Sequence, residues 1–332
     1  MNTDIGGSHL VDLASETLGA VALFASDEFF APKERLTHPG APVWRDGEYT
    51  DRGKWMDGWE TRRRRDVLPG EPGFDDAHDD CVIKLAVQGV IHAIDVDTTH
   101  FKGNFPESCS LEACVMPGAT THYDLSRAVW HTVMERTPLR GDANNVFRVA
   151  ATHATHVRLS IFPDGGVARL RVFGDVTPDW NALRHRGEID LAAVVNGGRV
   201  IDCSDMFFGS RHNVIMPGPP RGMADGWETK RRRVPGHDWT IVKLGARGSI
   251  ARVEVDTRHF KGNAPGACSV DACTTELPDG DWQELLARTA LAPDRRHAFD
   301  ATLKRISSVT HVRLNIFPDG GVARLHVFGR LE

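Results

Sequence analysis

The sequence contains no apolar run that approaches the ~18 residues needed to span a membrane as a helix. Its first residues, 1–7, lack the charged and apolar regions of a signal peptide. It also lacks an excess of basic side chains, because 40 Lys and Arg stand against 45 Asp and Glu, for a net charge of −5. A basic nucleic-acid-binding face is therefore not expected. These absences predict a soluble cytoplasmic protein that binds neither membranes nor nucleic acids.

Three common catalytic motifs are missing as well. The chain has no G-x-S-x-G, no G-x-x-x-x-G-K-[ST] and no H-E-x-x-H, so serine hydrolysis, nucleotide-dependent chemistry and zinc proteolysis have no support. Cysteine is scarce, at six residues, and the pairs Cys109/Cys114 and Cys268/Cys273 lack the short spacings of structural zinc modules. We expect these thiols to be reduced, small, buried side chains.

What the sequence does contain is a long internal repeat. Residues 96–104, VDTTHFKGN, recur at 255–263 with Arg258 in place of Thr99 as the only change. The matched blocks keep the same order along the chain, and their period is too long for a solenoid repeat. We predict two domains, 11–174 and 189–330, joined by a linker at 175–188 that holds a short helical turn.

Each repeat is rich in strand signals. Residues 82–87 and 90–96 are apolar and β-branched and predict a hairpin that turns at Gln88-Gly89, and 241–244 with 250–255 repeat the pattern. Residues 156–162 and 167–173 alternate around Pro163-Asp-Gly-Gly166 and predict a closing hairpin. Helix is expected only at 125–136 and 282–290. Many short strands with little helix predict an all-β fold, with one antiparallel sandwich or jelly roll per repeat.

An arginine-rich block present in both repeats is the first candidate site. In a purely structural interpretation, this block is a solvated edge strand that resists aggregation. In a functional interpretation, it is a clamp for a carboxylate, which the forked guanidinium of arginine can bind with two hydrogen bonds. The candidate residues are Glu60, Arg63 and Arg64, mirrored by Glu228, Arg231 and Arg232.

The second candidate site is the repeated loop after residue 97. It presents His100, Lys102 and Asn104, which supply a proton carrier, a positive charge and an amide, and the alternative is a structural loop. Nearby, Glu112 could orient the histidine, bind substrate by accepting a hydrogen bond from an amide NH2, or lie on the surface. The mirrored residues are His259, Lys261, Asn263 and Asp271.

Four motifs together resemble the allantoicase family over nearly the whole chain. They are SDEFFA at 26–31, DGWETRRR at 57–64, DTTHFKGN at 97–104 with PESCS at 106–110, and IFPDGGVARLRVFG at 161–174. The resemblance implies hydrolysis of allantoate to ureidoglycolate and urea, a step of purine breakdown. The closing strands also resemble galactose-binding-like jelly rolls, so two tandem jelly rolls of that type are expected.

The groups of allantoate suggest roles for the candidate residues. We expect Arg63 or Arg64 to bind the carboxylate and Glu60 to accept a ureido hydrogen bond, while His100 moves protons to the leaving urea. Lys102 and Asn104 would polarise the ureido oxygen. The sequence leaves open which repeat holds the working site. It also leaves open whether a divalent metal takes part, since no cofactor is certain. The alternative to an enzyme is a non-catalytic binding module of galactose-binding-like fold. Exposed edge strands favour a homo-oligomer.

Overall fold

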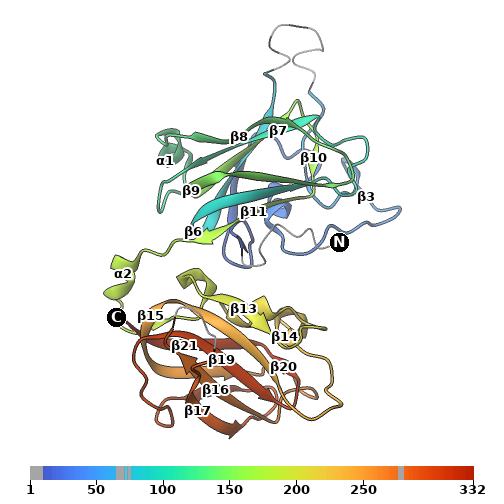
Figure 1. Ribbon diagram of the computed structural model, residues 1–332. Coiled ribbons are helices and arrows are strands. Elements are labelled where there is room, and N and C mark those ends of the chain that lie inside the picture. The colour runs from blue at the N-terminus through green and yellow to red at the C-terminus, as the bar shows by residue number, and fades with distance from the viewer. Residues whose placement is uncertain (1–9, 65–70, 72, 74–75, 276–279) are drawn as a thin grey trace. The chain divides into compact units, whose positions relative to one another are not determined.

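The structure is a computed structural model that describes residues 10–64, 71, 73, 76–275 and 280–332 (Figure 1). The chain forms two compact units, residues 1–177 and 178–332. Strands dominate both units, so the all-β prediction is confirmed. Within the described residues, no helix is long and apolar enough to cross a membrane.

The elements of the first unit follow one another in an order that the second unit largely repeats. They are β1 (Val11–Asp12), β2 (Val21–Ala25), η1 (Lys33–Thr37), β3 (Tyr49–Thr50), β4 (Gly53–Lys54), β5 (Trp59–Glu60), β6 (Asp79–Asp97), β7 (Ser108–Cys114), α1 (His122–Ser126), β8 (His131–Pro138), β9 (Asn144–Phe162), β10 (Gly166–Val167) and β11 (Arg169–Val176).

A short helix opens the second unit, and strands account for most of the rest. The elements are α2 (Trp180–Arg184), β12 (Ile189–Asp190), η2 (Val194–Asn196), β13 (Arg199–Cys203), η3 (Arg211–Ile215), η4 (Met223–Asp225), β14 (Trp227–Glu228), β15 (Asp238–Asp256), β16 (Ala267–Cys273), β17 (Gln283–Ala290), β18 (Arg296–Phe299), β19 (Val309–Phe317), β20 (Gly321–Val322) and β21 (Arg324–Leu331).

The long strand β6 organises the first unit. Its first part pairs with β2 and the end of β9, and its second part pairs with β11 and the start of β9. The main sheet therefore runs β1-β11-β6-β9-β7-β8 and folds around one apolar core. Every pairing in it is antiparallel. The core includes fully buried Ile83, Ile94, Leu111, Leu159 and Leu170.

Neither of the two predicted hairpins is formed, because the strands pair with other partners. Gln88-Gly89 is no turn, because β6 runs straight through it with an irregular register. Gly89 serves close packing instead, since a Cβ there would lie 2.6 Å from the carbonyl oxygen of Asp175. Likewise β9 and β11 do not pair with each other, because β6 lies between them. The second unit repeats both corrections, with 241–255 inside the single strand β15 and β15 between β19 and β21.

The two helix predictions are wrong for most of their length. In the first unit α1 ends at Ser126, and the remainder of 125–136 enters β8, where Met134 is buried opposite Leu111 of β7. In the second unit 283–290 is strand β17. Strand pairing outweighs the local helix preference of both segments, because pairing with β7 and β16 buries their apolar side chains. The helical turn expected in the linker is present as α2.

Candidate active site

The loop after β6 is held in a strained conformation. His100 has a φ of 72°, in the left-handed region that a non-glycine residue rarely adopts. The loop is fixed on both sides, because the backbone N–H of His100 donates to Asp142 Oδ1 at 2.8 Å and the neighbouring Phe101 is fully buried. The strain thus places the imidazole at the surface while the loop packs below it.

The imidazole of His100 has a defined partner on one nitrogen. Nε2 lies 3.3 Å from the carbonyl oxygen of Pro42, which can only accept a hydrogen bond. In the neutral ring the proton is therefore on Nε2, and Nδ1 keeps a lone pair. Nδ1 is the nitrogen that can take up a proton from a ligand and return it.

Glu60 is the buried acid of the site. It follows the fully buried Trp59 in β5, and β5 pairs with β10 so that Glu60 lies opposite Gly166. Its side-chain Oε1 accepts a hydrogen bond of 2.7 Å from Asn104 Nδ2. Burial raises the pKa of the Glu60 carboxyl, while the Asn104 hydrogen bond and the charge of Arg63 act in the opposite direction.

One pocket of about 260 Å³ collects four of the predicted residues. Lys102 extends into solvent there with its Nζ 3.8 Å from Asp142 Oδ2. This pocket brings the acid of β5 together with the imidazole, ammonium and amide of the loop after β6, although Glu60 and Asn104 lie 44 residues apart in the chain. Its lining comprises Phe30, Trp44, Lys54, Met56, Glu60, His100, Lys102, Gly103 and Asn104.

The predicted arginines lie in an adjoining pocket that shares only Phe30 with the first. Arg64 Nη2 binds the carbonyl oxygen of His78 at 2.5 Å and Asp79 Oδ1 at 3.2 Å. Arg63 is exposed, with Nη1 3.5 Å from Asp164 Oδ1. The last arginine of the predicted run, residue 65, lies outside the described residues. Arg64 is thus already engaged by protein acceptors, and Arg63 is the more available of the two.

The predicted acid Glu112 is not brought to the pocket. Its Oε2 accepts a hydrogen bond of 2.8 Å from Arg158 Nε across the β7–β9 pair. Arg158 in turn lies 4.7 Å from the centre of the Trp130 ring. Asp271 repeats this contact with Arg313, at 3.1 Å. These acids belong to cross-strand ion pairs that stabilise the sheet.

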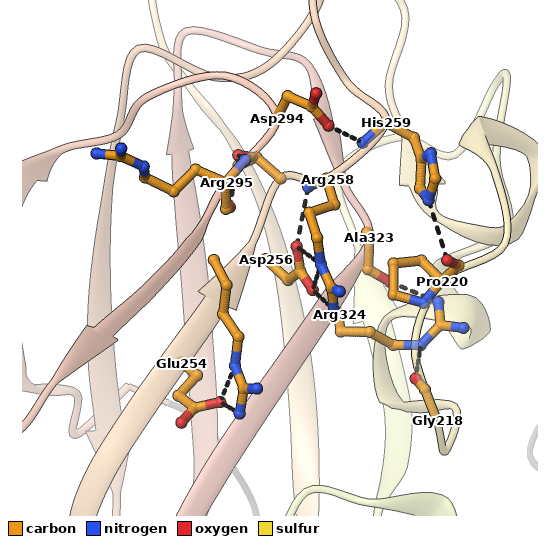
Figure 2. A network of polar contacts seen from close by, with 12 residues as sticks. Gly218, Pro220, Glu254, Asp256, Arg258, His259, Asp294, Arg295, Ala323 and Arg324 are labelled. Atoms are coloured by element: carbon orange, nitrogen blue, oxygen red, sulfur yellow. Dashed lines mark hydrogen bonds and ion pairs between the residues drawn. The ribbon is translucent and has the colours of Figure 1, made fainter.

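The second unit repeats the loop in a more open form. His259 has the same φ of 72°, donates its backbone N–H to Asp294, and places Nε2 3.0 Å from the carbonyl oxygen of Pro220 (Figure 2). Asn263 again donates to Glu228, and Lys261 Nζ lies 3.9 Å from Asp294. However, His259 is exposed where His100 is half-buried, and Glu228 is half-buried where Glu60 is buried.

The hollow in the second unit also has different walls. It measures about 590 Å³ and is lined by Glu228, Arg231, Arg232 and Asn263 among others, but not by His259 or Lys261. Arg232 is committed to Asp238, at 2.6 Å. The second unit therefore keeps the residue types but does not enclose them together as the first unit does.

Comparison with known proteins places both units in one family. The family model named Allantoicase repeat matches residues 11–177 and 189–332. "Probable allantoicase 2" of Burkholderia pseudomallei is 46% identical, over 97% of this chain and 95% of that protein. "Probable allantoicase" of Photobacterium profundum is 44% identical, over 96% of each. The crystal structure of allantoicase from Saccharomyces cerevisiae superposes with a TM-score of 0.80 at 36% identity, over 96% of this chain and 93% of that one.

The chain belongs to the allantoicase family. The resemblance seen in its motifs is thereby confirmed, as is the all-β fold in two tandem repeats. Its enzyme class is that of the family, a hydrolase that acts on carbon–nitrogen bonds other than peptide bonds, in linear amidines.

Several residues around the two histidine loops of this allantoicase-family chain were not predicted from the sequence. Asp142 and Asp294 hold the histidine loops, but they lie 42 and 35 residues beyond their histidines, so matching the repeats does not find them. Trp44 and Lys54 come from a segment that only the first unit has. Fourteen residues separate Pro42 from Asp57, whereas four separate Pro220 from Asp225. That difference in length was the available signal.

In each unit, a buried arginine anchors the loop whose proline contacts the histidine. Arg169, only 1% exposed, donates to the carbonyl oxygen of Gly40 at 3.0 Å and to Asp57 Oδ2 at 2.8 Å. Arg324 contacts Gly218 and Asp225 in the same way, as Figure 2 shows for Gly218. Arg169 thus connects β11 to the loop that contains Pro42, and Arg324 connects β21 to the loop that contains Pro220. These two prolines accept the hydrogen bonds of His100 and His259.

The other predicted features of the sequence are structural. His156 is fully buried, with Nε2 3.0 Å from the carbonyl oxygen of Ala119. The four repeat-related cysteines are buried as expected, and burial raises the pKa of Cys109 and of Cys268 to about 12. In the described part of the chain, no three His, Cys, Asp or Glu side chains gather so as to hold a metal ion.

Proposed function

We propose that this chain hydrolyses allantoate to ureidoglycolate and urea in the pocket of its first unit. The observation that carries the proposal is the cluster of Glu60, His100, Lys102 and Asn104 around one cavity in a member of the allantoicase family. Allantoate carries a carboxylate and two ureido groups on one carbon, and the cluster offers a hydrogen-bond acceptor, donors and a proton carrier for them.

Glu60 and Asn104 would hold the ureido group. The free oxygen of Glu60 can accept a hydrogen bond from a ureido NH2, because its other oxygen is occupied by Asn104. Lys102 stands at the rim and can polarise the ureido oxygen as negative charge develops on it. Of the two arginines expected to bind the carboxylate, Arg63 faces Asp164 and Arg64 faces Asp79, and neither lines this cavity.

His100 would move the protons. During hydrolysis the bond between the central carbon and one ureido nitrogen breaks, the oxygen of water bonds to that carbon, and the leaving nitrogen gains a proton. Nδ1 of His100 can take the proton from water and deliver it to the leaving urea, since Nε2 is tied to Pro42.

Burial favours the first unit as the working one. Its histidine is half-buried and its acid is buried, whereas His259 is exposed and Glu228 is half-buried. Electrostatic stabilisation of a reacting group is stronger where water is excluded. The second unit keeps the same residue types with less enclosure.

The duplication provides a matched test of this proposal. We expect purified protein to release urea from allantoate, and Glu60→Gln or His100→Ala to lower kcat roughly 100-fold or more. Urea release would be measured with and without added divalent metal and with a chelator, since metal dependence is a separate question.

The corresponding changes Glu228→Gln and His259→Ala locate the site. If they lower kcat as strongly as the first-unit changes, the assignment to the first unit fails. If the wild-type protein releases no urea under any metal condition, the enzymatic function itself fails and a ligand-binding role replaces it.

We further propose that the protein is a cytoplasmic homo-oligomer. Support comes from the edge strands β8 and β17, each paired on one side only in the described sheets. The substrate is a small molecule, so a single pocket suffices for binding and no macromolecular partner is required.

A further inference from the structure

The first unit carries an extra segment over its pocket. We call residues 43–56 the covering hairpin; it contains β3 and β4, which pair with each other as Tyr49–Lys54 and Thr50–Gly53. The second unit has four residues in the same place, between Pro220 and Asp225, and the last two of them begin the short helix η4. This ten-residue difference is the largest departure between the units near the candidate site.

The covering hairpin is fastened at several points. The backbone N–H of Val43 donates to Asp57 Oδ2 at 2.8 Å, and Arg52 Nη1 donates to the carbonyl oxygen of Phe29 at 2.9 Å. The guanidinium of Arg45 lies 4.4 Å from the centre of the Trp55 ring. These contacts hold a hairpin that would be marginal by itself.

The covering hairpin contributes Trp44, Lys54 and Met56 to the lining of the pocket. Lys54 Nζ lies 3.7 Å from the centre of the Trp44 ring, within the range of a cation–π interaction. The Trp44 ring lies 5.5 Å from the His100 ring. Both Trp44 and Lys54 line the cavity that also contains Glu60. The ammonium therefore lines the same cavity as the proton carrier His100, and Trp44 contacts both residues.

Lys54 differs from the other cations near the site in its partners. Lys102 faces Asp142, Arg63 faces Asp164, and Arg64 faces Asp79. Lys54 forms no ion pair with any residue that the structure describes, and its contact is the neutral Trp44 ring. A cation that lines a pocket and pairs with no carboxylate among the described residues is suited to bind an anionic ligand group.

We propose that Lys54, held by Trp44, binds the carboxylate of the ureide substrate, and that the covering hairpin thereby restricts substrate binding to the first unit. The inference rests on the proposed function, because it names the carboxylate partner within that pocket. It revises the expectation from sequence, where Arg63 or Arg64 had this role. The second unit, which lacks the hairpin, has no counterpart of Lys54.

The test compares two ligands that differ by the carboxylate alone. Allantoate has it, and diureidomethane carries both ureido groups on a carbon without it. Lys54→Ala is expected to raise KM for allantoate roughly 10- to 100-fold, the value of a charged hydrogen bond. The inhibition constant of diureidomethane against allantoate is expected to stay within about twofold. Lys54→Arg, which keeps the charge, is expected to restore most of the affinity.

Controls separate this inference from the proposed function. Tyr49→Ala changes an exposed residue of the same hairpin away from the pocket lining and is expected to keep the wild-type KM. Thermal shift with each ligand measures binding even without turnover. If Lys54→Ala binds allantoate like the wild type, or weakens both ligands equally, the role of Lys54 is overturned while hydrolysis stands. If wild-type protein releases no urea and allantoate produces no shift, both proposals fall.

Discussion

Glu60 is the residue whose environment most clearly suits catalysis. It is a carboxyl at 8% exposure with one oxygen committed to an amide donor and the other available. Burial raises its pKa, and Asn104 holds that rise in check by stabilising the charged form. A carboxyl balanced in this way can change its protonation state closer to neutral pH than an exposed glutamate does.

This balance predicts the pH dependence of Asn104 variants. If ionised Glu60 must accept a ureido hydrogen bond, kcat/KM rises with pH through the raised pKa of Glu60 and is lost below it. Asn104→Ala removes the hydrogen bond that lowers this pKa, so the acid limb of the kcat/KM profile should move to higher pH. Rates measured across pH with a urea assay check the shift.

A general loss of binding would not move the acid limb. If Asn104→Ala lowers kcat/KM by the same factor at every pH and leaves the acid limb in place, the result contradicts the proposed effect of Asn104 on Glu60. Asn263→Ala in the second unit is the matched control. If catalysis takes place in the first unit, this variant should keep the acid limb of the kcat/KM profile at its wild-type pH.

At the scale of elements, the buried arginine of β11 connects strand and loop. Arg169 donates to Gly40 and Asp57, and Asp57 also accepts the hydrogen bond that begins the covering hairpin. The guanidinium therefore fixes the loop that holds Pro42, and through Pro42 the imidazole of His100. A lysine cannot reproduce this set of bonds, because its ammonium lacks the planar fork.

Arg169→Lys should consequently lower both stability and activity. We expect a loss of about 2–4 kcal/mol in the free energy of unfolding, since a buried charge loses partners. The KM for allantoate should rise as well, because Asp57, which also fastens the covering hairpin that carries Lys54, loses its arginine partner. Denaturant unfolding and steady-state kinetics on the same preparations measure the two effects.

The matched change Arg324→Lys distinguishes the two effects. It should cost comparable stability in the second unit and leave KM near its wild-type value. A rise in KM equal to that of Arg169→Lys would argue against a working site confined to the first unit.

The sequence predicted the type of most elements but not their partners. Alternation and β-branching identified the strands of 82–96 and 156–173, yet neither turn signal marks a hairpin, because β6 runs through Gln88-Gly89 and the strands on either side of 163–165 do not pair. Gly89 was needed for close approach of β11, not for a turn. The stretch that became β8 has no strong alternation, and its pairing with β7 depends on contacts that no local pattern encodes.

The candidate site was predictable where it was duplicated. Glu60, His100, Lys102 and Asn104 each have a counterpart, and the structure brings these four to one pocket. Glu112 also has a counterpart but meets Arg158, because strand alternation cannot tell which neighbour a side chain faces. Lys54 was missed for the opposite reason, since it occurs in one copy and a search for repeats passes over it.

At the scale of the whole molecule, the two units share a topology but differ in enclosure. Each has a long strand, β6 or β15, between the strands that carry the loop-anchoring arginine and the buried histidine. Each also leaves one long outer strand, β8 or β17, paired on a single side. Such edges need protection from uncontrolled pairing, and association between identical subunits provides it.

We therefore expect the protein to sediment as an oligomer. Sedimentation velocity over a range of concentrations should give a mass that is a multiple of the 36.6 kDa chain. A single species at 36.6 kDa at micromolar concentration would contradict the proposal and leave the outer strands protected only by their own side chains.

The covering hairpin also has a consequence for solubility. In the first unit, Phe29 lies under the guanidinium groups of Arg52 and Arg62, and Phe30 lies beside Gly53. The equivalent pair in the second unit, Phe207 and Phe208, is 70% and 64% exposed. Through Arg52 and Gly53, the covering hairpin therefore helps to half-bury an aromatic pair in the first unit, whereas the second unit leaves the equivalent pair exposed to solvent.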